Sequence, residues 1–210
     1  MSDAAPRQRS SRLLEIVAVV LLGVATVGSA WCGYEASRWN GEEAELGRES
    51  LDTRLEASRL FGLATQTITY DSSVILSYAE AVAGENDELA EFIRSSLMRP
   101  DFEPVLERWQ ADVDAGQTPE SLLSDEAYID DLSVEYLAAE EQANALALEG
   151  QQAGEQADEY VLTTLLFASA LFFAGITSTF RYRVARATTV VLSALVLAYA
   201  ASRLADLPVL

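Results

Sequence analysis

Residues 160–180, YVLTTLLFASALFFAGITSTF, form an uninterrupted stretch without a single charged side chain. An α-helix rises about 1.5 Å per residue, so this stretch is long enough to cross a hydrocarbon core of about 30 Å. Arg181, Arg183 and Arg186 follow it at once, and an acidic segment precedes it. The stretch therefore predicts a transmembrane helix, and the rest of the chain can be placed relative to it.

The first apolar stretch in chain order, residues 13–34, follows a polar tail of residues 1–12, so residues 160–180 are the second apolar stretch. Trp31, Tyr34 and Trp39 lie at its end, and such aromatic residues are typical of the membrane–water interface. The alternative is a secretory signal peptide cleaved after Ala30, but the apolar run is long for that role. We expect a retained transmembrane helix.

Residues 187–207 are the third apolar stretch and predict a third transmembrane helix. Arg203 and Asp206 lie three residues apart near its end, so they are expected to pair at the interface. Pro208 is expected to end the helix.

Charge is divided unevenly between the apolar stretches and the segment of residues 35–159. The net charge is −19, but this segment alone holds 30 acidic residues against 7 arginines, for a charge of −23. The remainder is therefore slightly basic. Phosphate binding needs basic side chains, so we expect no nucleic-acid partner.

Arginines on either side of the spans set the expected orientation, because basic residues are enriched in cytoplasmic loops. Residues 1–12 and the loop of residues 181–186 are expected in the cytoplasm. Residues 35–159 and 208–210 are then extracytoplasmic, in a multi-pass protein of the cell membrane. The arginines that define this topology are Arg7, Arg9, Arg12, Arg181, Arg183 and Arg186.

The acidic segment is expected to be helical throughout. Residues 35–82 predict one helix, with a bend near Gly41 and Gly47. After a break at residues 84–87, Asp87 is expected to cap a short helix to Met98. Further elements are a helix over residues 102–115, a turn capped by Thr118 with Pro119 at the first helical position, and a helix from Ser124 or Asp125 that continues into the second span.

Two of these helices carry stripes with alternating steps of three and four residues, the spacing of a coiled-coil seam. They predict an all-α protein whose antiparallel helical bundle is continuous with the first two spans. The first stripe is Phe61, Thr65, Ile68, Ser72, Ile75, Ala79 and Val82. The second is Ile129, Leu132, Tyr136, Ala139, Ala143, Leu146, Gly150, Ala153, Ala157 and Tyr160.

Small residues recur every four positions in each span. Such spacing allows helices to approach closely in a membrane, either within this chain or against a partner chain. These predicted packing residues are Ala25, Ser29, Gly33, Ala170, Ala174, Ser178, Ala194, Ala198 and Ser202.

WCGYEASRWNGEEA and YVLTTLLFASALFFAGI, at the two membrane exits, resemble a family of uncharacterised prokaryotic three-pass membrane proteins of unknown function. The resemblance covers about a fifth of the chain. It implies the three-span layout and no particular activity.

Few residues in this sequence could perform catalysis. The chain has no histidine, the most frequent general base, and its single Cys32 lies in or beside a span. No glycine-rich phosphate loop is present, and the spans lack a central charge of the kind that ion-coupled transport uses. We therefore expect neither an enzyme nor a cofactor.

Clustered carboxylates raise the question of a divalent-metal site. Residues 112–116 have only part of a calcium-loop pattern, because a third ligand and the closing glutamate are missing. A denser group consists of Asp125, Glu126, Asp130, Asp131 and Glu135. A solvated acidic face is the expected interpretation, and no metal is assigned.

Two functions remain from the sequence. The first is a membrane-anchored interaction scaffold or sensory module that binds a protein partner or a second copy of itself. The second is an oligomeric cation channel or transporter subunit, with hydroxyls lining a pore and the acidic segment concentrating cations. The hydroxyl residues concerned are Thr163, Thr164, Thr177, Ser178, Thr188, Thr189 and Ser193.

Overall fold

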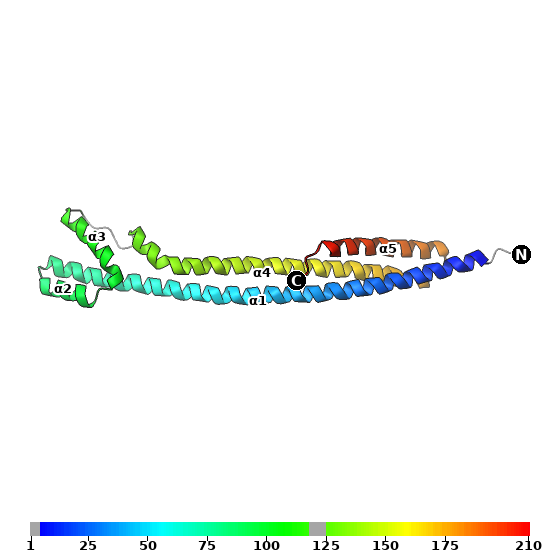
Figure 1. Ribbon diagram of the computed structural model, residues 1–210, viewed down its shortest axis with the longest axis horizontal. Helices are drawn as coiled ribbons and strands as arrows, with labels where there is room; N and C mark the ends of the chain where they lie inside the picture. Colours follow the sequence, from blue (N-terminus) through cyan, green and yellow to red (C-terminus); the bar gives the residue numbers. More distant parts are fainter. Residues whose placement is uncertain (1–4, 118–124) are drawn as a thin grey trace. The chain divides into compact units, whose positions relative to one another are not determined.

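The computed structural model describes the backbone of residues 5–117 and 125–210, with side chains from residue 14 onward, and all its regular elements are helices (Figure 1). The side chains of Arg7, Arg9 and Arg12 lie outside the described part of the chain, as does the predicted turn at Thr118 and Pro119. The elements are α1 (Ala5–Ala83), α2 (Asp87–Ser96), the 3-10 helix η1 (Pro100–Phe102), α3 (Glu103–Asp114), α4 (Glu126–Ile176), the 3-10 helix η3 (Thr177–Thr179) and α5 (Arg183–Asp206).

Within the described residues, three helices are long and apolar enough to cross a membrane, namely α1, α4 and α5. This finding indicates a multi-pass membrane protein. α1 includes the first apolar stretch and continues through Gly41 and Gly47 without interruption. α4 likewise continues from the acidic segment into the second apolar stretch, as predicted, because no proline or turn sequence separates them.

The chain divides into two compact units. The first unit comprises Met1–Arg48 and Leu146–Leu210, and so contains all three apolar stretches. The second unit is Glu49–Ala145, which holds α2, η1 and α3 together with parts of α1 and α4.

In the first unit, α1, α4 and α5 share one apolar core. Its fully buried members include Ala25 and Cys32 of α1, Tyr160 and Ala170 of α4, and Ala200 of α5. Small side chains let these helices approach closely, which is how membrane helices gain van der Waals contact.

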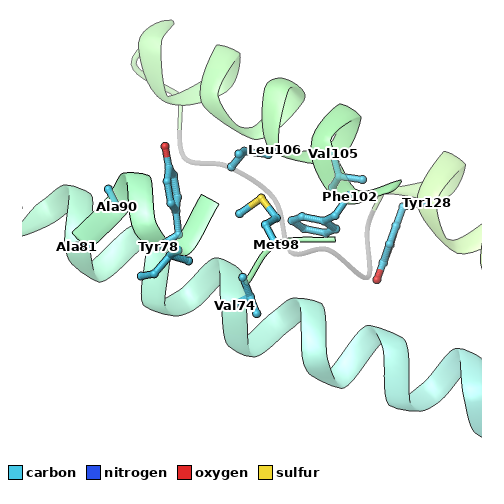
Figure 2. Packing of buried hydrophobic residues seen from close by; sticks show 10 residues of the cluster. Val74, Tyr78, Ala81, Ala90, Met98, Phe102, Val105, Leu106 and Tyr128 are labelled. Atoms are coloured by element: carbon cyan, nitrogen blue, oxygen red, sulfur yellow. The ribbon is translucent and has the colours of Figure 1, made fainter. Parts of the chain in front are cut away.

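In the second unit, α2, η1 and α3 cover the paired ends of α1 and α4. Phe102 and Leu106 are fully buried, and Figure 2 shows them with Met98 beside Val74 of α1. Phe102 packs edge to face on Tyr128 of α4, with ring centroids 5.7 Å apart. Burying apolar surface is the main favourable term holding such short helices in place.

The short helices differ in detail from the sequence-based expectation. The α2 cap is Asn86 rather than Asp87, because the Asn86 side chain accepts a hydrogen bond from the Leu89 N–H at 3.1 Å. The helix expected over residues 102–115 is α3, and the 3-10 helix η1 directly precedes it, with Pro100 and Pro104 in the first turns of η1 and α3. Proline fits there because the first-turn N–H groups have no partner within the helix.

Candidate functional sites

A buried polar cluster around Asp71 is the most connected feature of the second unit. Asp71 is 1% exposed and lies on α1. Its Oδ2 accepts a hydrogen bond from the Tyr128 hydroxyl of α4 at 2.7 Å, and the Arg99 Nε lies 3.2 Å from Oδ1. A buried carboxylate is tolerated only when it is paired and hydrogen-bonded, and here both conditions are met.

The Asp71 cluster connects three segments that are far apart in sequence. Arg99 precedes η1, Tyr128 lies in the first turns of α4, and both contact the same side chain of α1. Burial raises the pKa of the Tyr128 hydroxyl, and the neighbouring Asp71 carboxylate raises it further. Tyr128 therefore keeps its proton and acts as a donor at neutral pH.

A second ion pair fastens the start of α4 to α3. Arg108 donates to Asp125 Oδ2 from Nε at 2.9 Å and from Nη2 at 2.6 Å. Asp125 Oδ1 also accepts the Tyr128 N–H at 3.0 Å, so the same carboxylate caps the helix. Partial burial opposes ionisation of Asp125, but Arg108 and this backbone bond outweigh it and leave the pKa of the carboxyl below its ordinary value.

In the second unit, the buried face of α1 is shifted from the predicted stripe by one residue toward the N-terminus. Ile68 and Ile75 are half-buried, whereas Phe61 and Val82 are 54% and 45% exposed. Most of the buried positions directly precede a residue of the stripe. The residues that the structure buries along this part of α1 are Ser50, Ala57, Ala64, Asp71, Val74, Tyr78 and Ala81.

On α4 the predicted stripe and the inward face coincide more closely. Within the second unit Ala143 is fully buried, while Ile129, Leu132, Tyr136 and Ala139 are half-buried. Leu146, in the first unit, is also half-buried.

In the second unit, residues further along α1 contact residues earlier in α4. The Ser50 hydroxyl donates to the Ala143 carbonyl at 2.8 Å, and the Phe61 ring meets that of Tyr136 with centroids 5.4 Å apart. The two helices are therefore antiparallel in this unit.

The first unit has a polar cluster of its own, which we call the clasp, formed by Glu35, Arg38, Trp39 and Tyr160 around residues 208–210. The Tyr160 hydroxyl and the Trp39 indole both donate to the Pro208 carbonyl, at 2.9 Å and 3.3 Å. Arg38 donates to the Leu210 carbonyl. The clasp thus joins the segment after α5 to both α1 and α4.

Glu35 is the least satisfied member of the clasp. It is 0% exposed, and its Oε2 accepts the Leu210 N–H at 3.3 Å. Within the described part of the chain, its Oε1 has no hydrogen-bond partner. A buried carboxylate oxygen in that situation has lost its hydration without a replacement.

Ion pairs lie at both ends of the spans in the first unit. Arg186 pairs with Glu15 at 2.9 Å, which joins the beginning of α5 to the beginning of the first apolar stretch. Arg203 pairs with Glu159 of α4 rather than with Asp206, which corrects the expected pairing. The pair forms across two helices because both groups lie at the entrance of a span.

The predicted small-residue packing positions occupy different surroundings. Ala25, Ala170 and Ala174 are buried, and Ser29 and Ala194 are half-buried. The chain itself leaves Gly33, Ser178, Ala198 and Ser202 exposed. In α5 the inward face is instead formed by Val190, Ser193, Leu197 and Ala200. Ser193 belongs there because its hydroxyl donates to the Ala170 carbonyl of α4 at 2.8 Å.

Close approach of α1 and α4 also depends on Gly28. A Cβ atom added there would lie 2.5 Å from Phe167 Cε1, closer than side chains tolerate. Phe167 is 2% exposed, so its ring has little room to move. The four-residue spacing did not include Gly28, although glycine is the residue that such an approach requires.

The hydroxyls considered for a pore mostly bond to the backbone of their own helix. Thr163, Thr164 and Thr177 each donate to the carbonyl four residues earlier, as does Thr188. Thr189 also lies 3.1 Å from the Thr177 hydroxyl. Ser178 is nearest the Gly175 carbonyl, at 3.4 Å. Such bonds satisfy the hydroxyls within the helices.

Among the residues whose side chains are described, no three His, Cys, Asp or Glu groups lie together in a way that could hold a metal ion. In the acidic group at the start of α4, Asp125 forms a salt bridge with Arg108.

No protein-family model, curated protein or solved structure matches this chain, so the resemblance to a three-pass family stays a prediction.

Proposed function

We propose that this is a non-enzymatic integral membrane protein that acts as an interaction scaffold or sensory module. In this proposal residues 35–159 lie outside the cytoplasm and recognise a protein partner. The observation that supports it most is the set of large apolar side chains that the second unit leaves uncovered. Leu51, Leu55, Leu76 and Val134 are each about 60% exposed, on a segment that is otherwise strongly acidic.

Leu51 and Leu55 illustrate the kind of surface involved. They lie four residues apart, and therefore on one face of α1. An acidic residue directly follows each leucine, Asp52 after Leu51 and Glu56 after Leu55. Apolar residues that a soluble segment leaves exposed, rimmed by charge, are typical of interaction sites. A partner with apolar residues flanked by Arg or Lys would match this surface.

The polar cluster at Asp71 supports the same proposal in another way. It holds η1 and the start of α4 on α1, so the apolar side chains of α2, Leu89 and Phe92, belong to a unit with fixed local packing. A fixed surface loses less conformational entropy on binding than a flexible one. We propose an antiparallel bundle of coiled-coil type here, with Ser50 and Asp71 among its inward positions.

Partner recovery from native membranes tests the proposal. Because the chain has no lysine, cross-linking should use carboxylate-reactive reagents. The combined variant Leu51→Ser and Leu55→Ser should lower recovery of the cross-linked partner about tenfold, as expected for loss of a central apolar contact. The matched control is Gln151→Ser with Gln152→Ser, at exposed positions of α4, and it should recover the partner fully.

The result that contradicts the scaffold proposal is a wild-type chain that yields no cross-linked partner from its own membranes. Equal recovery with wild type and the leucine variant would instead contradict the assignment of the surface. Circular dichroism and gel filtration of both variants distinguish lost binding from lost folding.

Membrane orientation, the other part of the proposal, can be measured with single cysteines. The only native cysteine, Cys32, is buried, so background labelling should be low. With Ser73→Cys, a membrane-impermeant maleimide should label intact cells. With Arg181→Cys, it should label only permeabilised cells. The reverse pattern would place the acidic segment in the cytoplasm.

The alternative is an oligomeric cation channel or transporter subunit. Thr188 and Ser178 support it, since the chain leaves both exposed and further copies could gather them around a pore. Cation flux into vesicles that contain the purified protein is the test. Flux above that of empty vesicles would favour this function over the scaffold.

A further inference from the structure

An open hollow of about 600 Å³ lies along the beginning of α5, within the first unit. Its lining is almost entirely apolar, with a single charged residue. The lining residues are Arg183, Val184, Ala187, Thr188, Val191, Leu192 and Leu195.

The surface of the hollow suits a hydrocarbon chain. Val184, Val191 and Leu195 are 79%, 58% and 64% exposed, so the protein itself does not cover them. The one hydroxyl, on Thr188, already donates to the Val184 carbonyl at 3.0 Å. What remains is an apolar strip along a helix that can span a membrane.

Arg183 gives the hollow a positively charged end. It is exposed, and the described part of the chain contains no carboxylate paired with it, whereas Arg186 pairs with Glu15. A guanidinium can donate two parallel hydrogen bonds to a phosphate and is attracted to anionic lipid surfaces. The charge and the apolar strip therefore complement the two parts of a single kind of molecule.

We propose that this hollow binds one anionic phospholipid, with an acyl chain along Val184, Val191 and Leu195 and the phosphate at Arg183. The inference requires that α5 lies in a bilayer, and it does not depend on partner recognition by the acidic segment. It assigns a ligand class to α5 that the proposed scaffold function does not include.

Native mass spectrometry of the full chain tests this inference. The protein is equilibrated with equal amounts of phosphatidylglycerol and phosphatidylcholine that carry the same acyl chains, and the retained lipid is identified. We expect retained phosphatidylglycerol to exceed phosphatidylcholine about fivefold, the effect of one arginine near an anionic headgroup. Arg183→Gln should remove this preference.

Two variants separate the hollow from general electrostatic attraction. Arg181→Gln changes the net charge equally but lies outside the lining, so it should keep the preference. Val191→Trp should lower retention of both lipids, because the indole fills the apolar strip while Arg183 stays. Circular dichroism verifies that each variant folds.

Several outcomes would overturn the inference. They are equal retention of both lipids by the wild type, equal losses with Arg181→Gln and Arg183→Gln, or unchanged retention with Val191→Trp. A second copy of the chain seated on α5, seen as a dimer that releases no lipid, would also overturn it. None of these results bears on partner recovery at Leu51 and Leu55.

Discussion

Asp71 of α1 accepts a hydrogen bond from the Tyr128 hydroxyl of α4 at 2.7 Å, although the two residues lie 57 positions apart in the sequence. Both side chains are buried, at 1% and 5% exposed. The same carboxylate is 3.2 Å from Arg99 Nε, so one acidic side chain organises three segments of the second unit.

Tyr128→Phe should destabilise the second unit. It removes the hydroxyl but keeps the ring against Phe102, leaving Asp71 Oδ2 without its closest donor, at a cost of about 1–3 kcal/mol. Thermal unfolding of the full chain in detergent, followed by circular dichroism, measures the change.

Tyr70→Phe is the matched control for that substitution. The Tyr70 hydroxyl also donates a hydrogen bond, to the Leu97 carbonyl at 2.5 Å, but this residue is 45% exposed. Water can replace the lost donor there, so the loss should stay within about 1 kcal/mol. Equal losses for the two variants would contradict the special role of the buried pair.

The Arg108–Asp125 pair should make stability depend on acid pH. The pKa of Asp125 is lowered on folding, so its contribution is present above the unfolded value of about 3.9 and is lost as pH falls through the lower folded value. Arg108 is half exposed, so Arg108→Gln should cost less than about 1 kcal/mol at neutral pH.

The measurement is the melting temperature of wild type and Arg108→Gln between pH 6 and pH 3. The gap between them should be constant above about pH 4 and shrink below it. The control is Arg48→Gln, which removes the same charge from α1. Among the described residues, no carboxylate pairs with Arg48. A gap for Arg108→Gln that widens with acid would contradict a lowered pKa of Asp125 in the folded protein.

Gly28→Ala should destabilise the first unit, because the new methyl group would lie 2.5 Å from the Phe167 ring. Overpacking of this kind costs about 1–3 kcal/mol. Gly23→Ala is the control: a Cβ there meets nothing within 4 Å, and alanine favours a helix over glycine. Thermal aggregation in detergent should therefore begin earlier for Gly28→Ala and not for Gly23→Ala.

Glu35→Gln should stabilise the first unit by about 1 kcal/mol, since it removes a buried charge while its amide oxygen can still accept the Leu210 N–H. Glu45→Gln changes an exposed carboxylate on the same helix and should alter stability by less than about 0.5 kcal/mol. Detergent unfolding of both variants compares them. A lower melting temperature for Glu35→Gln would show that the charge itself is needed.

Hydropathy and helix-breaking residues predicted the helical class, three helices apolar enough to span a membrane, and the continuity of α4. These features depend on local composition, which the sequence displays directly. The inward face of α1 could not be predicted from the sequence, because Ser50 and Asp71 are polar and resemble surface positions. Their burial depends on the Ala143 carbonyl, Arg99 and Tyr128, which only the folded chain brings near.

The clasp was missed for a related reason. Trp39 was interpreted as an interfacial aromatic residue and Pro208 as a helix stop, and neither pattern specifies that one bonds to the other. In α5, the spacing of small residues predicted that Ala194 faces inward. The hydrogen bond from Ser193 to the Ala170 carbonyl instead turns the neighbouring face of α5 toward α4. Contacts of this kind are set by the partner helix and leave no periodic signal.

The inward residues Ser50, Ala57, Ala64, Asp71 and Tyr78 recur every seven positions along α1. One inserted residue turns all later side chains by about 100° and would carry Asp71 away from Tyr128. Evolutionary relatives of this chain should therefore vary in length between Ser50 and Tyr78 only in multiples of seven.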